Sequence, residues 1–286
     1  MVVVSAAACG AGATPAPTGT PAPLVADVDL GGRTIHIVCV GPTDSGRPTV
    51  VFESGGGVPY ENWGDLMAAL KPTDRACAYD RAGIGMSPAA GAPRTVRDQV
   101  ADLAAVLEQV GVTGPIVYVA HSAGGWNAIL YTAEHPDQVV GVVLVDIRPP
   151  GLDGALIAEL PPETPDEPDG IRQVRQDFDV FPHDPSLNPE DLDIAASYAE
   201  VMAAPGFGDR PTEILWATES DLMNWPGFDE DLATRLNAAI ERVRHDVEEL
   251  ADVPRVTRVA TGHFIHHEQP AIVLEAIRRV LELAGG

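Results

Sequence analysis

Lysine is nearly absent from this sequence of 286 residues. Lys71 is the one lysine among 18 basic residues, and these face 42 acidic residues, so the formal net charge is −24. A negative field of this size repels phosphate backbones and anionic lipid headgroups. No basic patch with interleaved aromatic residues is found either. We therefore expect no nucleic-acid partner.

Long apolar runs are missing too. None approaches the roughly 18 consecutive apolar residues that indicate a transmembrane helix. Aromatic residues make up only 5% of the chain, but hydrophobic residues reach 45%, which excludes a wholly disordered protein. A chain of this length buries a large core without needing disulfides or metals to fold.

Cysteine is scarce, with three in the chain. The first, Cys9, follows three alanines, and a tract rich in Thr, Pro, Ala and Gly extends to residue 23. Such a tract cannot form a packed core and predicts an extended tether. The segment Ala6–Cys9 resembles a bacterial lipobox, which implies an exported lipoprotein tethered to a membrane through acylated Cys9, or a secreted protein. The alternative is a disordered tail on a cytoplasmic protein.

From residue 24 onward the pattern alternates between strands and helices. Several strand-like runs are nearly continuous in Val, Ile, Leu and Ala, which is typical of parallel strands covered on both faces. Helical periodicity is clearest over Thr95–Val110, where apolar residues recur at spacings of 3 and 4. The alternation predicts a mostly parallel sheet between helices. The predicted strands are Val25–Leu30, Thr34–Val40, Thr49–Glu53, Ala76–Tyr79, Pro115–Ala120, Val139–Asp146, Glu213–Ala217 and Val256–Ala260.

The regular alternation stops between about residues 148 and 210, a stretch rich in proline and acidic residues. We interpret 148–210 as a cap or lid insertion and not as an independent domain. The predicted organisation is then a tether at 1–23, a first part of the core at 24–147, the insertion at 148–210, and a second part of the core at 211–286.

Ser122 lies between a predicted strand and a predicted helix, in the sequence Val-Ala-His-Ser-Ala-Gly-Gly. A serine on a tight strand-to-helix turn needs small neighbours because the backbone there is strained and crowded. Ala120, Gly124 and Gly125 meet that need. The start of the helix also supplies free N–H groups and a positive dipole end beside the hydroxyl. The pattern indicates a nucleophile; the alternative is a helix-capping serine.

Residues 24–286 resemble serine hydrolases of the α/β-hydrolase fold, in a carboxylesterase-type, exported branch. The resemblance rests on the turn around Ser122, on Tyr79–Ser87 (YDRAGIGMS), which is similar to the family's D-R-x-G-x-G-x-S segment, and on the Gly-His pair at 262–263. It implies an α/β architecture with an eight-stranded, mostly parallel sheet in the order 1-2-4-3-5-6-7-8 and a cap after strand 6. We interpret the Tyr79–Ser87 segment as structural.

In this family the nucleophile, the acid and the base come in that order along the chain. His263, in the loop after the last strand, matches the position of the base. Asp221, in the turn after the preceding strand, matches the position of the acid. Asp146, at the end of the Val139–Asp146 strand, is the alternative acid, because some members place it there.

The oxyanion of the reaction needs two backbone N–H donors. Ala123 supplies one in this interpretation, and Gly56, in the Gly55–Gly57 run after the third strand, supplies the other. Further pocket candidates follow from the same resemblance. They are Gly57, His121, Asp146, Phe178, Trp225 and Phe264. We expect no metal and no cofactor, since the proposed chemistry requires neither.

The resemblance also bears on the two remaining cysteines. Cys39 lies on the second predicted strand and Cys77 on the fourth, and the family's strand order makes these strands neighbours. A Cys39–Cys77 disulfide is therefore expected. The alternative is two buried free thiols, which pack as small hydrophobic side chains.

The function predicted from these residues is cleavage of a small-molecule carboxylic ester through an acyl-enzyme. Two alternatives stay open. One is an amide or peptide hydrolase similar to iminopeptidases, and the other is a non-catalytic surface module that keeps the fold for binding. Nothing in the sequence predicts the oligomeric state.

Overall fold

The computed structural model describes residues 22–219 and 228–285. Its centre is a single eight-stranded sheet with the strand order β1-β2-β4-β3-β5-β6-β7-β8, the order expected from the resemblance. The first two pairings, β1 with β2 and β2 with β4, are antiparallel, and all the others are parallel. The strands are β1 (Leu24–Asp29), β2 (Thr34–Val40), β3 (Thr49–Glu53), β4 (Ala76–Tyr79), β5 (Ile116–His121), β6 (Val139–Val145), β7 (Thr212–Ala217) and β8 (Arg255–Val259).

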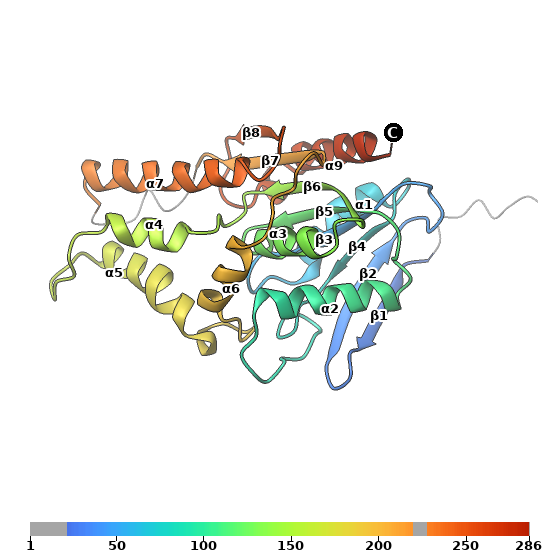
Figure 1. Ribbon diagram of the computed structural model, residues 1–286, viewed down its shortest axis with the longest axis horizontal. Helices are drawn as coiled ribbons and strands as arrows, with labels where there is room; N and C mark the ends of the chain where they lie inside the picture. The colour runs from blue at the N-terminus through green and yellow to red at the C-terminus, as the bar shows by residue number, and fades with distance from the viewer. Residues whose placement is uncertain (1–21, 220–227, 286) are drawn as a thin grey trace, which may run out of the picture.

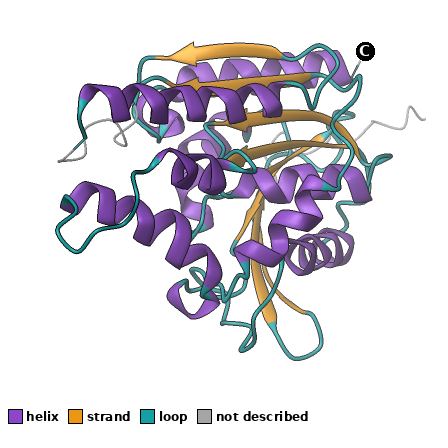
Figure 2. Ribbon diagram, turned by 60° about the vertical axis from the view of Figure 1, so that its left-hand side comes forward, coloured by secondary structure: helices purple, strands orange, loops and turns teal. Residues whose placement is uncertain are grey.

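Helices cover both faces of this sheet, as Figures 1 and 2 show. Helices α2 (Val96–Gln109) and α3 (Gly124–Glu134) pack in the apolar cluster on one face. Helices α1 (Gly64–Leu70) and α9 (Pro270–Ala284) pack in the cluster on the other face. The remaining helices are α4 (Leu152–Glu159), α5 (Asp169–Arg175), α6 (Ile194–Met202), α7 (Glu230–Glu248) and α8 (Ile265–Glu268), with shorter turns η1 (Tyr60–Trp63), η2 (Gln176–Val180), η3 (Phe181–His183) and η4 (Pro185–Leu187).

Local signals in the sequence place the long helices. Helix α2 begins with a capping box, in which Thr95 and Asp98 each bond the backbone N–H of the other. Its residues Val100, Leu103 and Leu107 are buried on one side, as the 3- and 4-residue spacing requires. These two features explain why the observed bounds differ by only one residue at each end from the predicted Thr95–Val110.

The insertion after β6 is helical. Helices α4 and α5 share an apolar cluster with α7, which belongs to the second part of the core. Figure 1 shows α4 lying beside α7 at the left of the view, with α5 and α6 below. Leu156 and Val174 from the insertion pack with Leu236 from α7 in this cluster. The cap is thus joined to the core by burial of apolar surface, which holds it beside the sheet.

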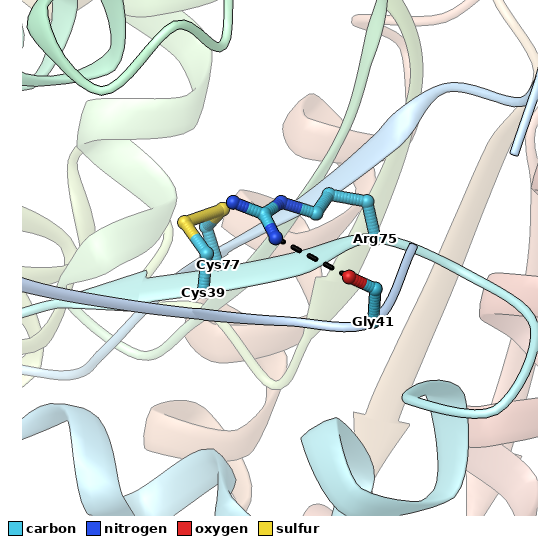
Figure 3. The surroundings of a disulfide bond; sticks show 4 residues. All are labelled: Cys39, Gly41, Arg75 and Cys77. Atoms are coloured by element: carbon cyan, nitrogen blue, oxygen red, sulfur yellow. Dashed lines mark hydrogen bonds between the residues drawn. A yellow bond between two sulfur atoms is a disulfide. The ribbon is translucent and has the colours of Figure 1, made fainter. Parts of the chain in front are cut away.

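Cys39 and Cys77 form a disulfide across the antiparallel β2–β4 pair, where they stand opposite each other in register. Both side chains are fully buried. Figure 3 shows the Arg75 guanidinium beside this disulfide, where its Nη1 donates a hydrogen bond to the Gly41 carbonyl oxygen at 3.3 Å. The pairing expected from the resemblance is therefore present.

In the described ranges, no helix has both the length and the apolar character needed to cross a bilayer.

Candidate active site

Ser122 occupies the turn between β5 and α3 with a φ of +52°, a conformation rare for a residue other than glycine. The turn is crowded on both sides. A Cβ at Gly124 would lie 2.6 Å from the Ser54 carbonyl oxygen, and one at Gly125 would lie 2.5 Å from Ile147 Cβ. Only glycine fits at these two positions. The small residues beside Ser122 are therefore required by packing, as the sequence indicated.

His263 connects Ser122 to a carboxylate. Its Nε2 lies 2.9 Å from Ser122 Oγ, and its Nδ1 lies 2.6 Å from Asp146 Oδ2. The three residues follow strands β8, β5 and β6, whose carboxyl ends meet at one edge of the sheet. A serine hydroxyl, an imidazole and a carboxylate bonded in this order match the geometry of nucleophilic triads.

Asp146 is held by three further contacts besides His263. Its Oδ1 accepts hydrogen bonds from the Ala217 backbone N–H at 3.0 Å and from Arg244 Nη2 at 3.2 Å. Its own N–H donates to the Leu215 carbonyl oxygen at 2.7 Å. The residue also has a positive φ of +40°. A non-glycine residue in this region is retained where the surrounding contacts determine it, which is common at functional sites.

Three of the predicted residues lie outside the described residues. They are Asp221, the predicted acid, Trp225, a pocket candidate, and Cys9, the predicted acylation site. Asp146, the alternative acid, is the carboxylate that contacts His263 in the part of the chain that is described.

The Gly55–Gly57 run lies against the Ser122 turn. A Cβ at Gly55 would be 3.1 Å from Ser122 Cβ, and one at Gly56 would be 3.6 Å from Ala123 Cβ. Within the described residues the backbone amides of Gly56 and Ala123 have no hydrogen-bond partner, whereas the Gly57 amide donates to Glu190 Oε1 at 2.9 Å. Gly56 and Ala123, the two residues chosen from the sequence, thus carry free N–H groups beside Ser122.

Arg81 is buried directly behind this glycine run. Its Nη1 donates to the Ser54 carbonyl oxygen at 2.7 Å and to Glu53 Oε1 at 2.5 Å. Its Nη2 donates to the Gly55 carbonyl oxygen at 2.7 Å and to Glu190 Oε1 at 2.9 Å, and its Nε donates to Glu190 Oε2 at 2.5 Å. All five guanidinium N–H groups are therefore used. The Tyr79–Ser87 segment has the structural role that we expected, at least at Arg81.

His121 and His266 pack edge to face beside His263. His121 and His266 have ring centroids 4.5 Å apart, and His121 Nε2 lies 3.0 Å from the His263 carbonyl oxygen. Burial lowers the pKa of His266 to about 3, helped by the neighbouring histidines, and burial lowers the pKa of His121 in the same direction. His121 therefore supports the His263 loop as a neutral donor. Among the described residues no three His, Cys, Asp or Glu side chains are grouped to hold a metal ion.

A cavity of about 280 Å³ opens at Ser122. Gly56, Gly57 and Ala123 line it on the core side, while residues of the cap, such as Phe181 and Glu190, close it from the other side. Most of the lining is apolar. Three of the polar lining residues form a connected series, in which Asn127 donates to Gln99 at 3.0 Å and Gln99 donates to Glu190 at 2.8 Å.

This cavity is not lined by the other described pocket candidates, which are His121, Asp146, Phe178 and Phe264. Phe178 lines a second cavity of about 530 Å³ that shares Trp126 and Ile194 with the first. The Arg148 guanidinium lies over the Phe178 ring at 5.0 Å. Phe264 is partly exposed and its ring lies 5.4 Å from that of His263. Gly57 is among the residues that line the first cavity.

Two residues that the sequence did not single out make contacts to this site. Glu190 comes from the acidic stretch of the cap, and Arg244 comes from the middle of α7. Neither belongs to a motif, and each is one of many charges in its segment. No signal in a single sequence distinguishes them from solvated surface residues.

Parts of this chain are similar in sequence to known esterases and lipases. A bifunctional esterase/perhydrolase of Acinetobacter calcoaceticus is 30% identical over 188 residues, which are 65% of this chain and 60% of that protein. Lipase LipV of Mycobacterium tuberculosis is 35% identical over 126 residues, 44% of this chain and 46% of the lipase. The matched regions cover between 26% and 60% of the length of four curated relatives, which include the esterase/perhydrolase.

Solved structures share the fold at low identity. A thermophilic esterase from Thermogutta terrifontis matches with a TM-score of 0.58 at 19% identity, over 93% of this chain and 100% of that one. The haloalkane dehalogenase DbeA from Bradyrhizobium elkani matches with a TM-score of 0.62 at 15% identity, over 92% and 99%. The model of the alpha/beta hydrolase family matches residues 50–276. Because this match covers most of the sequence, the chain belongs to the alpha/beta hydrolase family.

Proposed function

We propose that this protein is a serine hydrolase that cleaves carboxylic esters through an acyl-enzyme. The observation that carries the proposal is the hydrogen-bonded series Ser122, His263 and Asp146, with distances of 2.9 Å and 2.6 Å. The esterase and lipase relatives favour an ester as the substrate. A serine at the position of the nucleophile argues against the dehalogenase chemistry of DbeA, because members of that kind use an aspartate there.

In the proposed mechanism, Ser122 Oγ attacks the ester carbonyl carbon while His263 Nε2 accepts the hydroxyl proton. The carbonyl oxygen becomes an oxyanion that receives hydrogen bonds from the Gly56 and Ala123 amides. The C–O bond to the alcohol then breaks, and the proton on His263 leaves with the alcohol. Water, deprotonated by His263, attacks the acyl-enzyme and releases the carboxylic acid and free Ser122.

We assign the acid role to Asp146 in place of Asp221. A carboxylate on Nδ1 keeps the imidazole in the tautomer whose Nε2 accepts a proton, and it stabilises the imidazolium that forms. Asp146 has the contact to Nδ1 that this role requires. The cavity of about 280 Å³ beside Ser122, with its apolar lining, suits an ester with a short or medium acyl group.

The test is covalent labelling with a fluorophosphonate, whose fluoride is displaced by an activated serine oxygen. Peptide mapping by mass spectrometry should place the label on Ser122, and Ser122→Ala and His263→Ala should abolish it. Turnover of a p-nitrophenyl ester should fall by about 10⁴- to 10⁶-fold in either variant. No labelling of a correctly folded wild-type protein would favour the binding module, and faster cleavage of a matched anilide than of the ester would favour the amide hydrolase.

We further propose that the protein works in an oxidising compartment, since structural disulfides such as Cys39–Cys77 persist there. The predicted acylation of Cys9 is tested by intact-mass analysis of protein expressed in a bacterial host that processes lipoproteins. The expected result is the mass of residues 9–286 with a diacylglyceryl group on Cys9, a product that Cys9→Ser does not form. The mass of the unmodified chain contradicts acylation.

A further inference from the structure

A carboxylate of the cap is buried against the glycine run that follows β3. Glu190 is only 5% exposed, although it comes from the acidic, proline-rich stretch of the insertion. Its Oε1 accepts from the Gly57 amide at 2.9 Å, and its two oxygens together accept from Arg81. Gln99 Nε2 adds a fourth hydrogen bond at 2.8 Å. A buried carboxylate needs such partners, because removing an unpaired charge from water is very costly.

These contacts hold the glycine run from two sides. Arg81 binds the carbonyl oxygens of Ser54 and Gly55, and Glu190 binds the amide of Gly57. The Gly56 N–H belongs to the same planar peptide group as the Gly55 carbonyl oxygen that Arg81 binds, and it has no partner within the described residues. The next peptide group is held by Glu190 through the Gly57 N–H. Glycine residues have little intrinsic conformational preference, so a run of three does not hold a defined shape on its own. External hydrogen bonds must therefore set the direction of the Gly56 N–H.

The segment 188–193, which carries Glu190, is itself anchored to the core. Arg94 N donates to the Asp191 carbonyl oxygen at 2.9 Å, and Asp193 N donates to the Arg94 carbonyl oxygen at 2.7 Å. The side chain of Asn188 closes the segment by bonding both the N–H and the carbonyl of Leu192. These bonds set the position from which Glu190 reaches the glycine run.

A glycine on the core side allows this approach. Gly83, in the Tyr79–Ser87 segment, has a φ of +90°, and a Cβ there would lie 1.9 Å from the Pro189 carbonyl oxygen. Two independent parts of the chain thus fit each other at this place, one from the core and one from the cap. The same fit brings Glu190 to Arg81.

The charge balance is consistent with a permanently ionised Glu190. Burial by itself raises the pKa of this carboxyl, but the Arg81 charge and the hydrogen bonds from Arg81, Gly57 and Gln99 outweigh burial, so the pKa lies below its ordinary value. Arg81 in turn lies between Glu190 and Glu53.

We propose that Glu190 is a positioning residue for catalysis: contributed by the cap, it holds Gly57 so that the Gly56 amide points at the oxyanion formed on Ser122. This inference rests on the proposed function. It assigns to the cap a part in stabilising the transition state, in addition to enclosing the substrate. In this proposal Glu190 acts on the oxyanion through Gly57.

The experiment compares Glu190→Ala with Glu167→Ala. Glu167 is a matched control, because it is also a buried cap carboxylate paired with an arginine, Arg175, at 3.1 Å, but it makes no contact with the glycine run. Loss of one oxyanion donor lowers kcat by about 10²- to 10³-fold in other hydrolases. For Glu190→Ala we expect kcat for p-nitrophenyl butyrate to fall by about 100-fold, with KM changed by less than about 3-fold.

A boronic acid that forms a tetrahedral adduct with Ser122 provides a second readout. Its affinity should fall in Glu190→Ala by about the same factor as kcat, because the adduct uses the same amides. Glu190→Gln keeps an oxygen that accepts from the Gly57 amide, so its loss in kcat should be less than about 10-fold. Gly83→Ala, which displaces segment 188–193 from the core side, should reproduce the loss in kcat with Glu190 intact.

Melting temperatures and fluorophosphonate labelling separate the possible failures. If the wild type is labelled at Ser122 and Glu190→Ala keeps a kcat and a boronate affinity within about 3-fold of Glu167→Ala, the positioning role is wrong and the proposed function stands. A rise in KM at constant kcat also overturns it. If Glu190→Ala does not fold, the outcome rests on Gly83→Ala, and a normal kcat in that variant contradicts the proposal.

Discussion

Arg244 Nη2 lies 3.2 Å from Asp146 Oδ1, whereas His263 contacts the other carboxylate oxygen, Oδ2. The same Nη2 donates to the Ala217 carbonyl oxygen at 3.0 Å, and the guanidinium packs over the Trp216 ring at 5.0 Å. Helix α7 therefore helps to hold the carboxylate that orients His263. Both side chains of this contact are largely buried, so dissolved salt weakens their attraction only a little.

Replacement of Arg244 tests this contact. Arg244→Ala should lower kcat by about 10-fold at nearly constant KM, because small displacements of a group that orients the base slow the chemical step. Steady-state kinetics with a p-nitrophenyl ester measure the effect. The matched control is Arg242→Ala, an exposed position on the same helix, which should stay near the wild-type rate. Equal rates for the two variants would contradict the role of Arg244.

The identity of the acid is tested by two amides. Asp146→Asn should lower kcat by about 10⁴-fold, because an amide favours the wrong imidazole tautomer while keeping the shape of the side chain. Asp221→Asn should change kcat by less than about 5-fold, since the residue has no role in the proposed mechanism. A large loss in Asp221→Asn together with a mild one in Asp146→Asn would restore the assignment made from the sequence.

Stability should depend on pH through His266. Its Nε2 accepts from the Asn62 side-chain amide at 2.6 Å, which requires the neutral ring. With a folded-state pKa of about 3 against 6.5 in the unfolded chain, only the unfolded state takes up a proton as the pH falls below 6.5. Stability from the neutral ring is therefore present above pH 6.5 and decreases toward pH 3.

Between pH 7 and pH 5 this difference should cost about 2 kcal/mol in the free energy of unfolding. Urea unfolding at both pH values measures it, and His266→Gln should reduce the loss. His245→Gln, at an exposed position on α7, is the control that should leave the wild-type loss unchanged. An identical pH dependence in wild type and His266→Gln would rule out His266 as its source.

The disulfide should contribute to stability through the unfolded chain. Cys39 and Cys77 are 38 residues apart. Closing a loop of that length lowers the entropy of the unfolded chain, which raises the free energy of the unfolded state by about 4 kcal/mol at 25 °C. In urea titrations, we expect the free energy of unfolding of the double variant Cys39→Ala/Cys77→Ala to be about 3–4 kcal/mol lower than that of the wild type. Addition of a reductant should destabilise the wild type but not the double variant. A difference below about 1 kcal/mol would contradict this contribution.

Local patterns explain why so much of the fold was predictable. The eight strands were predicted to within one residue at each end. Continuous apolar runs mark buried central strands such as β5 and β6, but not the largely exposed edge strand β8. The turn around Ser122 was recognisable because its strain and crowding admit only small neighbours. The strand order and the cysteine pairing came from the resemblance to a known fold and not from the pattern itself.

Local patterns did not identify which aspartate contacts His263. Asp146 and Asp221 follow adjacent strands, and both were compatible with the order of residues along the chain. Asp221 remains untested, because it lies outside the described residues, and Asp146 contacts His263. A distance between side chains on loops that are 117 residues apart is not encoded in any local pattern.

Local sequence was enough to predict the strands and helices, the turn at Ser122, the histidine after the last strand, and the glycines at which backbones approach each other. Each of these depends on the residue's own conformational limits or on its near neighbours in the chain. Three contacts became visible only in the folded chain: Asp146 with His263, Arg244 with Asp146, and Glu190 of the cap with Gly57. Charged side chains are common and chemically alike, so their partners are chosen by the packing of distant segments.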